Sequence, residues 1–449
     1  MRASMLLAAT AASLAAIAAC ASSEEESTPP TAEAPPAPIP DSGLPDVDVD
    51  VADADGDTRL PDCSSAGWCV TAFPDADLDF RDVWPFEDVA FAIADSASEG
   101  VKFLEWKKST NAWEYIDDQS QNRPGAFASA VYAPNEDEVY FASGPSSIYR
   151  GKRGVPPETK WTWTRTDLPD AIVGHSASHE HGRPYSSAMR ERVPVMGVWG
   201  FDTANVYAYF SNTIFRRDPA DGSWSAVYTV SDLDAASEHA FFVSAAGTGP
   251  DDMWFVGARD RSSALSTNLH CPLVVRKTAA GWERIADGVV GTSSSAPCAA
   301  RAGTQRVGNT FSGWLSNVGR VSATEYVALY NGRSALSTAS VELTHIRIGD
   351  SDATDGGSAI TFAQSAVPLK LGVGSGPPNA AHSLWRGDGE TWLSAWGLVL
   401  RGADDGTYST STLSRDGTAV RASVRRVRGT SNQNLWAVGV RHAFHKTIP

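Results

Sequence analysis

One short strand pattern recurs seven times along the chain, and this recurrence limits the possible folds more than any other feature. In each copy, polar residues close a turn, and apolar or aromatic positions then alternate with small ones. Such alternation is expected for a strand packed between neighbouring sheets. The copies are EDVAFAIA (87–94), DEVYFASG (137–144), ANVYAYF (204–210), DDMWFVG (251–257), TEYVALYNG (324–332), ETWLSAWG (390–397) and QNLWAVG (433–439). They predict seven equivalent units, with loop insertions where the spacing is long.

Residues 195–224 show one complete unit, which reads as four short strands separated by polar turns. A third strand follows each copy of the pattern, as in LEW (104–106), SIYR (147–150), TIFRR (213–217), LVVRK (273–277) and LVLR (398–401). Most are then followed by a fourth strand that opens on an aromatic residue, namely Trp113, Trp161, Trp224, Trp282 or Tyr408. Four antiparallel strands per unit are the content of one propeller blade. We therefore predict an all-β fold, a seven-bladed β-propeller over residues 61–449.

The last unit is incomplete, because only HAFHKTIP follows its second strand. That length suffices for a third strand but not for a fourth. The segment GWCVTAFPDAD (67–77) has the form of the other fourth strands, for example GWERIADG (281–288). An N-terminal strand that completes the C-terminal blade closes such a ring without leaving a free sheet edge. The sequence predicts this closure.

The turns DGSW (221–224) and DGTY (405–408) are near-copies of each other, each with Gly where a positive φ is favoured. With these turns, residues 61–449 resemble β-propellers of the broad kelch-like and Asp-box-like kind. The chain lacks the GH and WD signatures of WD40 repeats, and DGSW is shorter than a sialidase Asp-box. The resemblance therefore implies a fold and no activity.

Residues 1–19 have the layout of an export signal, with Arg2 followed by an uncharged run rich in Ala and Leu. The end of this run, Ile17-Ala18-Ala19-Cys20, resembles the lipobox of bacterial lipoproteins. The resemblance implies that Cys20 is lipidated and becomes the mature N-terminus. Since Ala21 and not Asp follows, it also implies sorting to the outer membrane of the cell envelope. An ordinary secretory signal with an incidental Cys is the alternative.

Residues 20–60 are rich in Pro, Ala and acidic residues, a composition that favours a disordered linker between anchor and domain. The stretch DVDVDVADADGD (46–57) suggests a calcium loop, but Val51 falls on the first ligand position of the EF-hand spacing. We interpret it as a solvated acidic linker. Since residues 1–60 hold 11 acidic and 2 basic side chains, they carry most of the formal net charge of −16. The weakly negative charge of the residues after 60 does not favour nucleic acid as a partner.

Four Cys follow the lipobox, and an exported chain normally pairs them as disulfides. Cys63 and Cys69 are close enough in sequence to staple the closing strand. Cys271 and Cys298 fall in a loop between strands two and three of the fourth unit and in the loop to the fifth unit. In a propeller both kinds of loop emerge on one face, so this pairing is geometrically reasonable. A catalytic thiol is the alternative reading.

Four insertions, residues 169–194, 258–271, 286–310 and 365–381, occupy connections expected on that same face. Propellers commonly place ligand sites in such loops. We therefore predict a non-catalytic, lipid-anchored protein that binds a protein or glycan partner through this face. The alternative is a hydrolase or lyase acting on polysaccharide there.

The first insertion contains His175, His179, Glu180 and His181. Imidazoles at this spacing can bind zinc, and a metal would favour the enzyme alternative. A polar surface loop that is rich in His by chance is the other interpretation, and we assign no catalytic residue and no other cofactor. The basic run Arg421, Arg425, Arg426 and Arg428 is expected on the solvated side of a strand, with an anion site as the alternative. Paired acids such as Asp251 and Asp252 recur at one turn of several units, so we expect them to be structural.

Overall fold

The computed structural model describes eleven segments of the chain, all within the compact unit formed by residues 59–449. They are residues 63–169, 185–186, 191–192, 196–234, 238–261, 269–291, 298–308, 313–332, 341–349, 360–367 and 381–447. The predicted signal peptide (1–19) and linker (20–60) lie outside them. These segments contain no helix with the length and apolar character that crossing a membrane requires.

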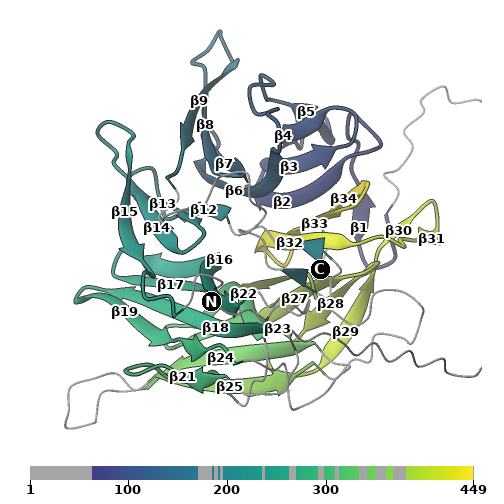
Figure 1. Cartoon of the computed structure of the whole chain (residues 1–449). Helices are drawn as coiled ribbons and strands as arrows, with labels where there is room; N and C mark the ends of the chain where they lie inside the picture. Colours follow the sequence, from purple (N-terminus) through teal and green to yellow (C-terminus); the bar gives the residue numbers. More distant parts are fainter. Residues whose placement is uncertain are drawn as a thin grey trace, which may run out of the picture. The chain divides into compact units, whose positions relative to one another are not determined.

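Seven antiparallel four-stranded sheets are arranged around a common centre (Figure 1). Blade 1 is β2 (Asp79–Pro85), β3 (Val89–Ser96), β4 (Gly100–Lys107) and β5 (Ala112–Tyr115), and blade 2 is β6 (Phe127–Asn135), β7 (Glu138–Gly144), β8 (Ser147–Arg153) and β9 (Trp161–Asp167). Blade 3 is β12 (Met196–Gly200), β13 (Val206–Phe210), β14 (Thr213–Arg217) and β15 (Trp224–Thr229), and blade 4 is β16 (Glu238–Gly249), β17 (Asp252–Arg261), β18 (Leu269–Thr278) and β19 (Gly281–Ala286).

Blade 5 is β22 (Gly313–Ser322), β23 (Glu325–Gly332), β24 (Glu342–Ile348) and β25 (Ile360–Ala366), and blade 6 is β26 (Ser383–Gly387), β27 (Glu390–Ala395), β28 (Leu398–Gly402) and β29 (Tyr408–Thr412). Blade 7 is β32 (Val424–Ser431), β33 (Asn434–Gly439), β34 (His442–Lys446) and β1 (Trp68–Val70). The first strand of each blade contacts the first strand of the next, and β32 contacts β2. The predicted all-β, seven-bladed ring is confirmed.

The ring closes through β1, which comes from the N-terminal end of the described chain and pairs antiparallel with β34. In this register Trp68 lies opposite Lys446 and Val70 opposite Phe444. Trp68 is fully buried, and its indole N–H donates a hydrogen bond of 2.7 Å to Ser411 Oγ in blade 6. The predicted closure is confirmed, and the closing strand is also tied to the neighbouring blade.

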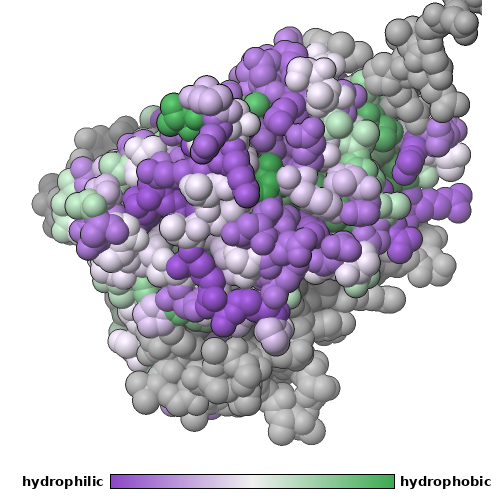
Figure 2. All heavy atoms as spheres, turned by 90° about the horizontal axis from the view of Figure 1, so that it is seen from above, coloured by the Kyte–Doolittle hydropathy of each residue, from purple (hydrophilic) through white to green (hydrophobic). Residues whose placement is uncertain are grey.

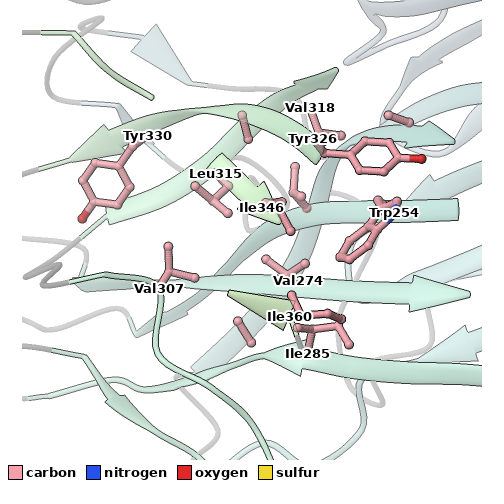
Figure 3. Close-up of a cluster of buried hydrophobic side chains, with 14 residues drawn as sticks. Trp254, Val274, Ile285, Val307, Leu315, Val318, Tyr326, Tyr330, Ile346 and Ile360 are labelled. Carbon is pink, nitrogen blue, oxygen red and sulfur yellow. The ribbon is translucent and has the colours of Figure 1, made fainter. Parts of the chain in front are cut away.

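The core lies in layers between adjacent blades, because successive residues of a strand face opposite neighbours. In β23, Tyr326 and Ala328 face blade 4, whereas Val327 and Leu329 face blade 6. Figure 3 shows the layer between blades 4 and 5, where Trp254, Val274 and Ile285 meet Tyr326, Ile346 and Ile360. The alternation in the sequence therefore reflects the packing of each strand against neighbouring blades on both sides. By contrast, the side of the molecule in Figure 2 is mostly hydrophilic, with scattered hydrophobic residues.

Asp252, one of the paired acids, holds two blades together. Its carboxylate accepts hydrogen bonds from Thr248 Oγ1 (2.9 Å), the Trp254 indole N–H (3.1 Å) and the Tyr326 hydroxyl of blade 5 (2.5 Å). Its role is structural, as the recurrence of acids at this turn predicts.

The basic run at residues 421–428 departs from expectation, because most of it belongs to β32, the first strand of blade 7. Arg426 Nε donates a 2.6 Å hydrogen bond to Asp82 Oδ1, and the Asp82 side chain is 1 % exposed. Asp82 Oδ2 accepts the backbone N–H of Val131 at 3.0 Å, so one carboxylate joins blades 7, 1 and 2. Arg425 and Arg428 are also partly buried. The prediction of a solvated strand side is wrong for these three, because their strand lies innermost in the ring.

Candidate binding face

Two kinds of connection leave the blades at the same face. Since neighbouring strands are antiparallel, the second-to-third strand connections and the blade-to-blade connections lie at the same ends of the sheets. Contacts confirm this at blade 7: Arg441, between β33 and β34, donates its backbone N–H to Leu78 O, just before β2 (2.8 Å). We call this the looped face and the opposite one the plain face. The four insertions, 169–194, 258–271, 286–310 and 365–381, all connect strands on the looped face.

Much of the insertion predicted at 258–271 is strand and not loop. Strands β17 and β18 extend to Arg261 and from Leu269, and they stay paired as far as Arg261 opposite Leu269. Short pairs also form in two other insertions: β10 (Tyr185–Ser186) with β11 (Glu191–Arg192), and β20 (Gly288–Val289) with β21 (Ala299–Ala300). The loop prediction is wrong there, because cross-strand pairing extends beyond the segment whose alternation is visible in the sequence.

The disulfide Cys271–Cys298 joins the extended β18 to the connection between blades 4 and 5. Both cysteines are buried with Leu269 and Val290 in a small apolar cluster on the looped face. Gly288 is required beside them, since a Cβ there would lie 2.4 Å from Cys271 Cβ. The pair Cys63–Cys69 is also bonded, and it ties β1, which contains Cys69, to the residues before it. Both predicted disulfides are confirmed.

A network of charged side chains lies beside this disulfide. Arg259, in β17, is fully buried and bonds the fully buried Asp287 with two hydrogen bonds of 2.9 and 2.7 Å. Asp232 accepts from Arg284 at 2.8 Å, and Arg301 pairs with Glu238 at 3.5 Å. Burial opposes the charge on Asp232, yet hydrogen bonding and proximity to Arg284 hold the pKa of its carboxyl below the usual value. These arginines are committed to carboxylates of the chain, so the network stiffens the face.

A row of three buried side chains crosses the extended part of blade 4. Asp260 lies opposite His239 on one side and His270 on the other, and all three are 5–6 % exposed. Burial raises the pKa of Asp260 to about 7 and lowers the pKa of His270 to about 4. This row is not visible in the sequence, since only strand register brings the three residues together. Among the described residues, no three His, Cys, Asp or Glu side chains are grouped so as to hold a metal ion.

The predicted zinc ligands His175, His179 and His181 lie outside the described residues, as does the predicted lipidation site Cys20.

A pocket of about 560 Å³ opens on the looped face, where blades 6 and 7 meet the closing strand. Its apolar wall includes Val70, Phe73 and Phe444. The other side is the connection from blade 6 to blade 7, which carries the short hairpin of β30 (Ser414–Arg415) and β31 (Thr418–Ala419). The polar part of the lining includes Arg415, Arg421, Arg441, Thr418, Asp416 and His442.

The pocket is rich in positive charge. Arg415, Arg421 and Arg441 are exposed, and Asp416 lies 4.0 Å from Arg415. Within the part of the chain that the structure describes, neither Arg421 nor Arg441 makes a side-chain ion pair. Arg421 stands out in the sequence as part of a basic run, whereas Arg441 does not, because its place in the pocket depends on ring closure.

His442 forms part of the same lining but is only 5 % exposed. Its Nε2 atom is buried and has no hydrogen-bond partner. Burial is the main cause that lowers the pKa of this imidazole to about 4, so it is neutral at pH 7. A neutral imidazole can either donate or accept a hydrogen bond through Nε2, depending on its tautomer.

Trp396 lies next to this region, in the connection between β27 and β28. It bridges to Ser423, at the end of the connection that lines the pocket, and is 46 % exposed. Val289, on β20, is the other large hydrophobic residue exposed on the described part of the looped face, at 42 %. Exposed tryptophans beside clefts are frequent contact residues in protein interfaces.

No family model and no curated protein matches the chain. Solved structures that resemble it include YCF48 bound to D1 peptide (12% identity, 85% of this chain and 96% of that chain, TM-score 0.47). Others are the WD40 β-propeller domain of Doa1 (10%, 84% and 96%, TM-score 0.46) and a PL25 ulvan lyase (9%, 85% and 95%, TM-score 0.45). At these values no ligand or activity is transferred to this chain, and the fold assignment rests on its own seven sheets.

Proposed function

We propose that the protein is a lipid-anchored binding protein of the cell envelope, which recognises a protein or glycan partner through its looped face without catalysing a reaction. The observation that carries the proposal is the pocket between blades 6 and 7, with its arginines and the exposed Trp396 beside it. A concave apolar site with a few polar groups is the usual form of a binding site. The seven blades supply a rigid frame for it.

The charged groups elsewhere on the looped face support binding over chemistry. The carboxylates around Arg259 are paired with arginines, and Asp287 is fully buried. Such groups hold the loops in place, whereas a general acid or base must reach a substrate. The alternative, a polysaccharide hydrolase or lyase assisted by zinc at His175, His179 and His181, draws on groups outside the described residues.

Membrane attachment is proposed from the lipobox alone. A diacylated Cys20 would supply more than one buried hydrocarbon chain, which is enough for stable anchoring. Cys20→Ser should then move the full-length protein from the membrane fraction to the soluble fraction. Unchanged fractionation would remove the anchor from the proposal without affecting the binding face.

The binding proposal is tested by cross-linking the full-length protein to its partner in intact cells. One variant replaces residues 368–380, in the connection between blades 5 and 6, with a Gly/Ser sequence of equal length. The control changes the exposed Glu87 and Lys108 of the plain face to Ser. We expect the cross-linked product to disappear in the first variant and to persist in the control.

The same protein is assayed for zinc content and for release of reducing ends from polysaccharides. Loss of both when His175, His179 and His181 are changed to Ala would overturn the binding-only proposal in favour of an enzyme.

A further inference from the structure

The pocket between blades 6 and 7 carries more positive than negative charge among its lining residues. Arg415, Arg421 and Arg441 line one pocket of about 560 Å³, and Asp416 is the acidic residue in that lining. Like charges gathered around an apolar surface repel each other. An anion placed among them would remove this repulsion, and a guanidinium is well suited to bind a carboxylate with two parallel hydrogen bonds.

The backbone holds one of these arginines in an unfavourable conformation. Arg441 has φ 62°, in the left-handed region that Gly and Asn adopt more easily. The turn is fixed on both sides, since the N–H of Val440 bonds Ser423 O at 3.1 Å and the N–H of Arg441 bonds Leu78 O at 2.8 Å. Strained residues held in place by their surroundings are frequent at ligand sites. This geometry keeps Arg441 within the pocket lining.

His442 forms part of the pocket wall. It is 5 % exposed, and its buried Nε2 atom lies against Gly439, where an added Cβ would be 2.9 Å away. The imidazole also packs near Phe444, with ring centroids 5.7 Å apart, at the edge of the apolar wall.

We propose that this pocket binds a peptide segment in which acidic and apolar side chains alternate. The acidic side chains would bond Arg421 and Arg441, and the apolar ones would contact Val70, Phe73 and Phe444. This inference rests on the proposed binding function and specifies the partner as a protein.

The lining favours a peptide over a glycan. A neutral sugar presents hydroxyls on all sides and needs both donors and acceptors around it, whereas the polar groups of this lining are mostly cationic donors and the opposite wall is apolar. An apolar wall faced by arginines matches a chain that presents carboxylates and aliphatic groups in alternation. The exposed Trp396 beside the pocket would extend the apolar contact along such a chain.

The test measures binding of a fluorescein-labelled hexapeptide of alternating Glu and Leu to the full-length protein by fluorescence anisotropy. Two companion peptides carry Gln for Glu or Gly for Leu, and a labelled polygalacturonate hexamer represents an acidic glycan. The protein variants are Arg421→Gln and Arg441→Asn, with the plain-face variant Arg216→Gln as matched control. Since Asn tolerates the left-handed region, Arg441→Asn should fold at least as well as the original protein, which far-UV circular dichroism and thermal unfolding would verify.

We expect the Glu/Leu peptide to bind, and each pocket variant to weaken binding about tenfold or more, since a charged hydrogen bond is lost. Both companion peptides should bind more weakly, and Arg216→Gln should bind normally. Three outcomes overturn the inference: equal binding by the pocket variants, binding of the polygalacturonate hexamer in place of the peptide, or no binding of either probe. If the cross-linked partner is retained in Arg421→Gln but lost when residues 368–380 are replaced, the peptide inference fails and the proposed function stands.

Discussion

The two faces of the ring are built from the same strands and differ only in how those strands are joined. On the plain face several turns are short and are closed by aspartates. Asp202, Asp221 and Asp405 each accept the N–H of a residue two positions further on, at 2.8 Å. On the looped face the connections vary in length and carry a disulfide, a buried ion network and a pocket. The strands are fixed by packing on both sides, so variation is tolerated only where they end.

The largest effect is expected when the ring itself is opened. Deleting residues 61–76 removes β1 and leaves the backbone of β34 without its partner at the sheet edge. It also removes Trp68, whose ring lies 6.0 Å from that of Trp392 in blade 6. We expect loss of folding or aggregation, seen as a high-mass species in gel filtration and loss of the strand signal in circular dichroism. A monomer with native circular dichroism would show that closure is dispensable and that the two faces do not depend on it.

The ring could be predicted from sequence because its determinants are local. Each blade repeats an alternating strand and a turn, so the unit is visible within about 30 residues, as in 195–224. The closing strand was found in the same way, because Trp68 and its neighbours repeat the pattern of the other fourth strands. The pair Cys271–Cys298 followed from the topology once the face of each connection was known, and the pair Cys63–Cys69 followed from closeness in sequence.

The remaining features depend on contacts between segments far apart in the chain. Asp82 and Arg426 are partners only because blades 7 and 1 are adjacent. The row of His239, Asp260 and His270 needs the register of three strands. The local sequence pattern predicts that the arginines of β32 are solvated, because that pattern does not show that this strand lies innermost in the ring.

Within the looped face, the buried ion network should matter most for stability. Arg259→Met leaves Asp287 fully buried with its main partner removed. Breaking a buried pair from one side costs about 3–5 kcal/mol. The control is Arg347→Met in blade 5, whose side chain is 58% exposed and 3.4 Å from Glu325, and it should cost under about 1 kcal/mol. Urea unfolding at pH 7 measures both. Equal costs would mean that the network does not stiffen the looped face.

The two disulfides should also differ in how much they stabilise the protein, with smaller effects than the buried ion network. Cys271 and Cys298 are 27 residues apart, whereas Cys63 and Cys69 are 6 apart. Because a longer loop leaves more freedom to the unfolded chain, the loop-entropy model predicts a loss of about 3–4 kcal/mol on changing the first pair to Ser and about 2 kcal/mol for the second. The free energies of unfolding of the two double variants check this. A larger loss from changing Cys63 and Cys69 would show that the disulfide at the closing strand stabilises the protein more than the disulfide on the looped face.

The smallest effect is a dependence of stability on pH that arises at the plain-face end of blade 7. His445 stacks on Trp436 with ring centroids 4.3 Å apart, and its Nε2 is 2.8 Å from Asn434 Oδ1. Burial, with a smaller contribution from Lys108, lowers the pKa of His445 from 6.5 to about 4. Between these pH values the unfolded chain binds a proton that the folded protein excludes, so the contribution of this histidine is present above pH 6.5 and is lost as the pH falls towards 4.

Between pH 7 and pH 5 this single group should cost the native state about 1–2 kcal/mol. His445→Gln keeps a side chain that can donate to Asn434 but cannot be protonated. The variant should therefore lose less stability than the original protein over that interval, whatever its absolute stability, and urea titrations at both pH values measure the difference. Equal losses in the two proteins would mean that His445 is protonated as easily in the ring as in the unfolded chain, and that acid sensitivity comes from the looped face.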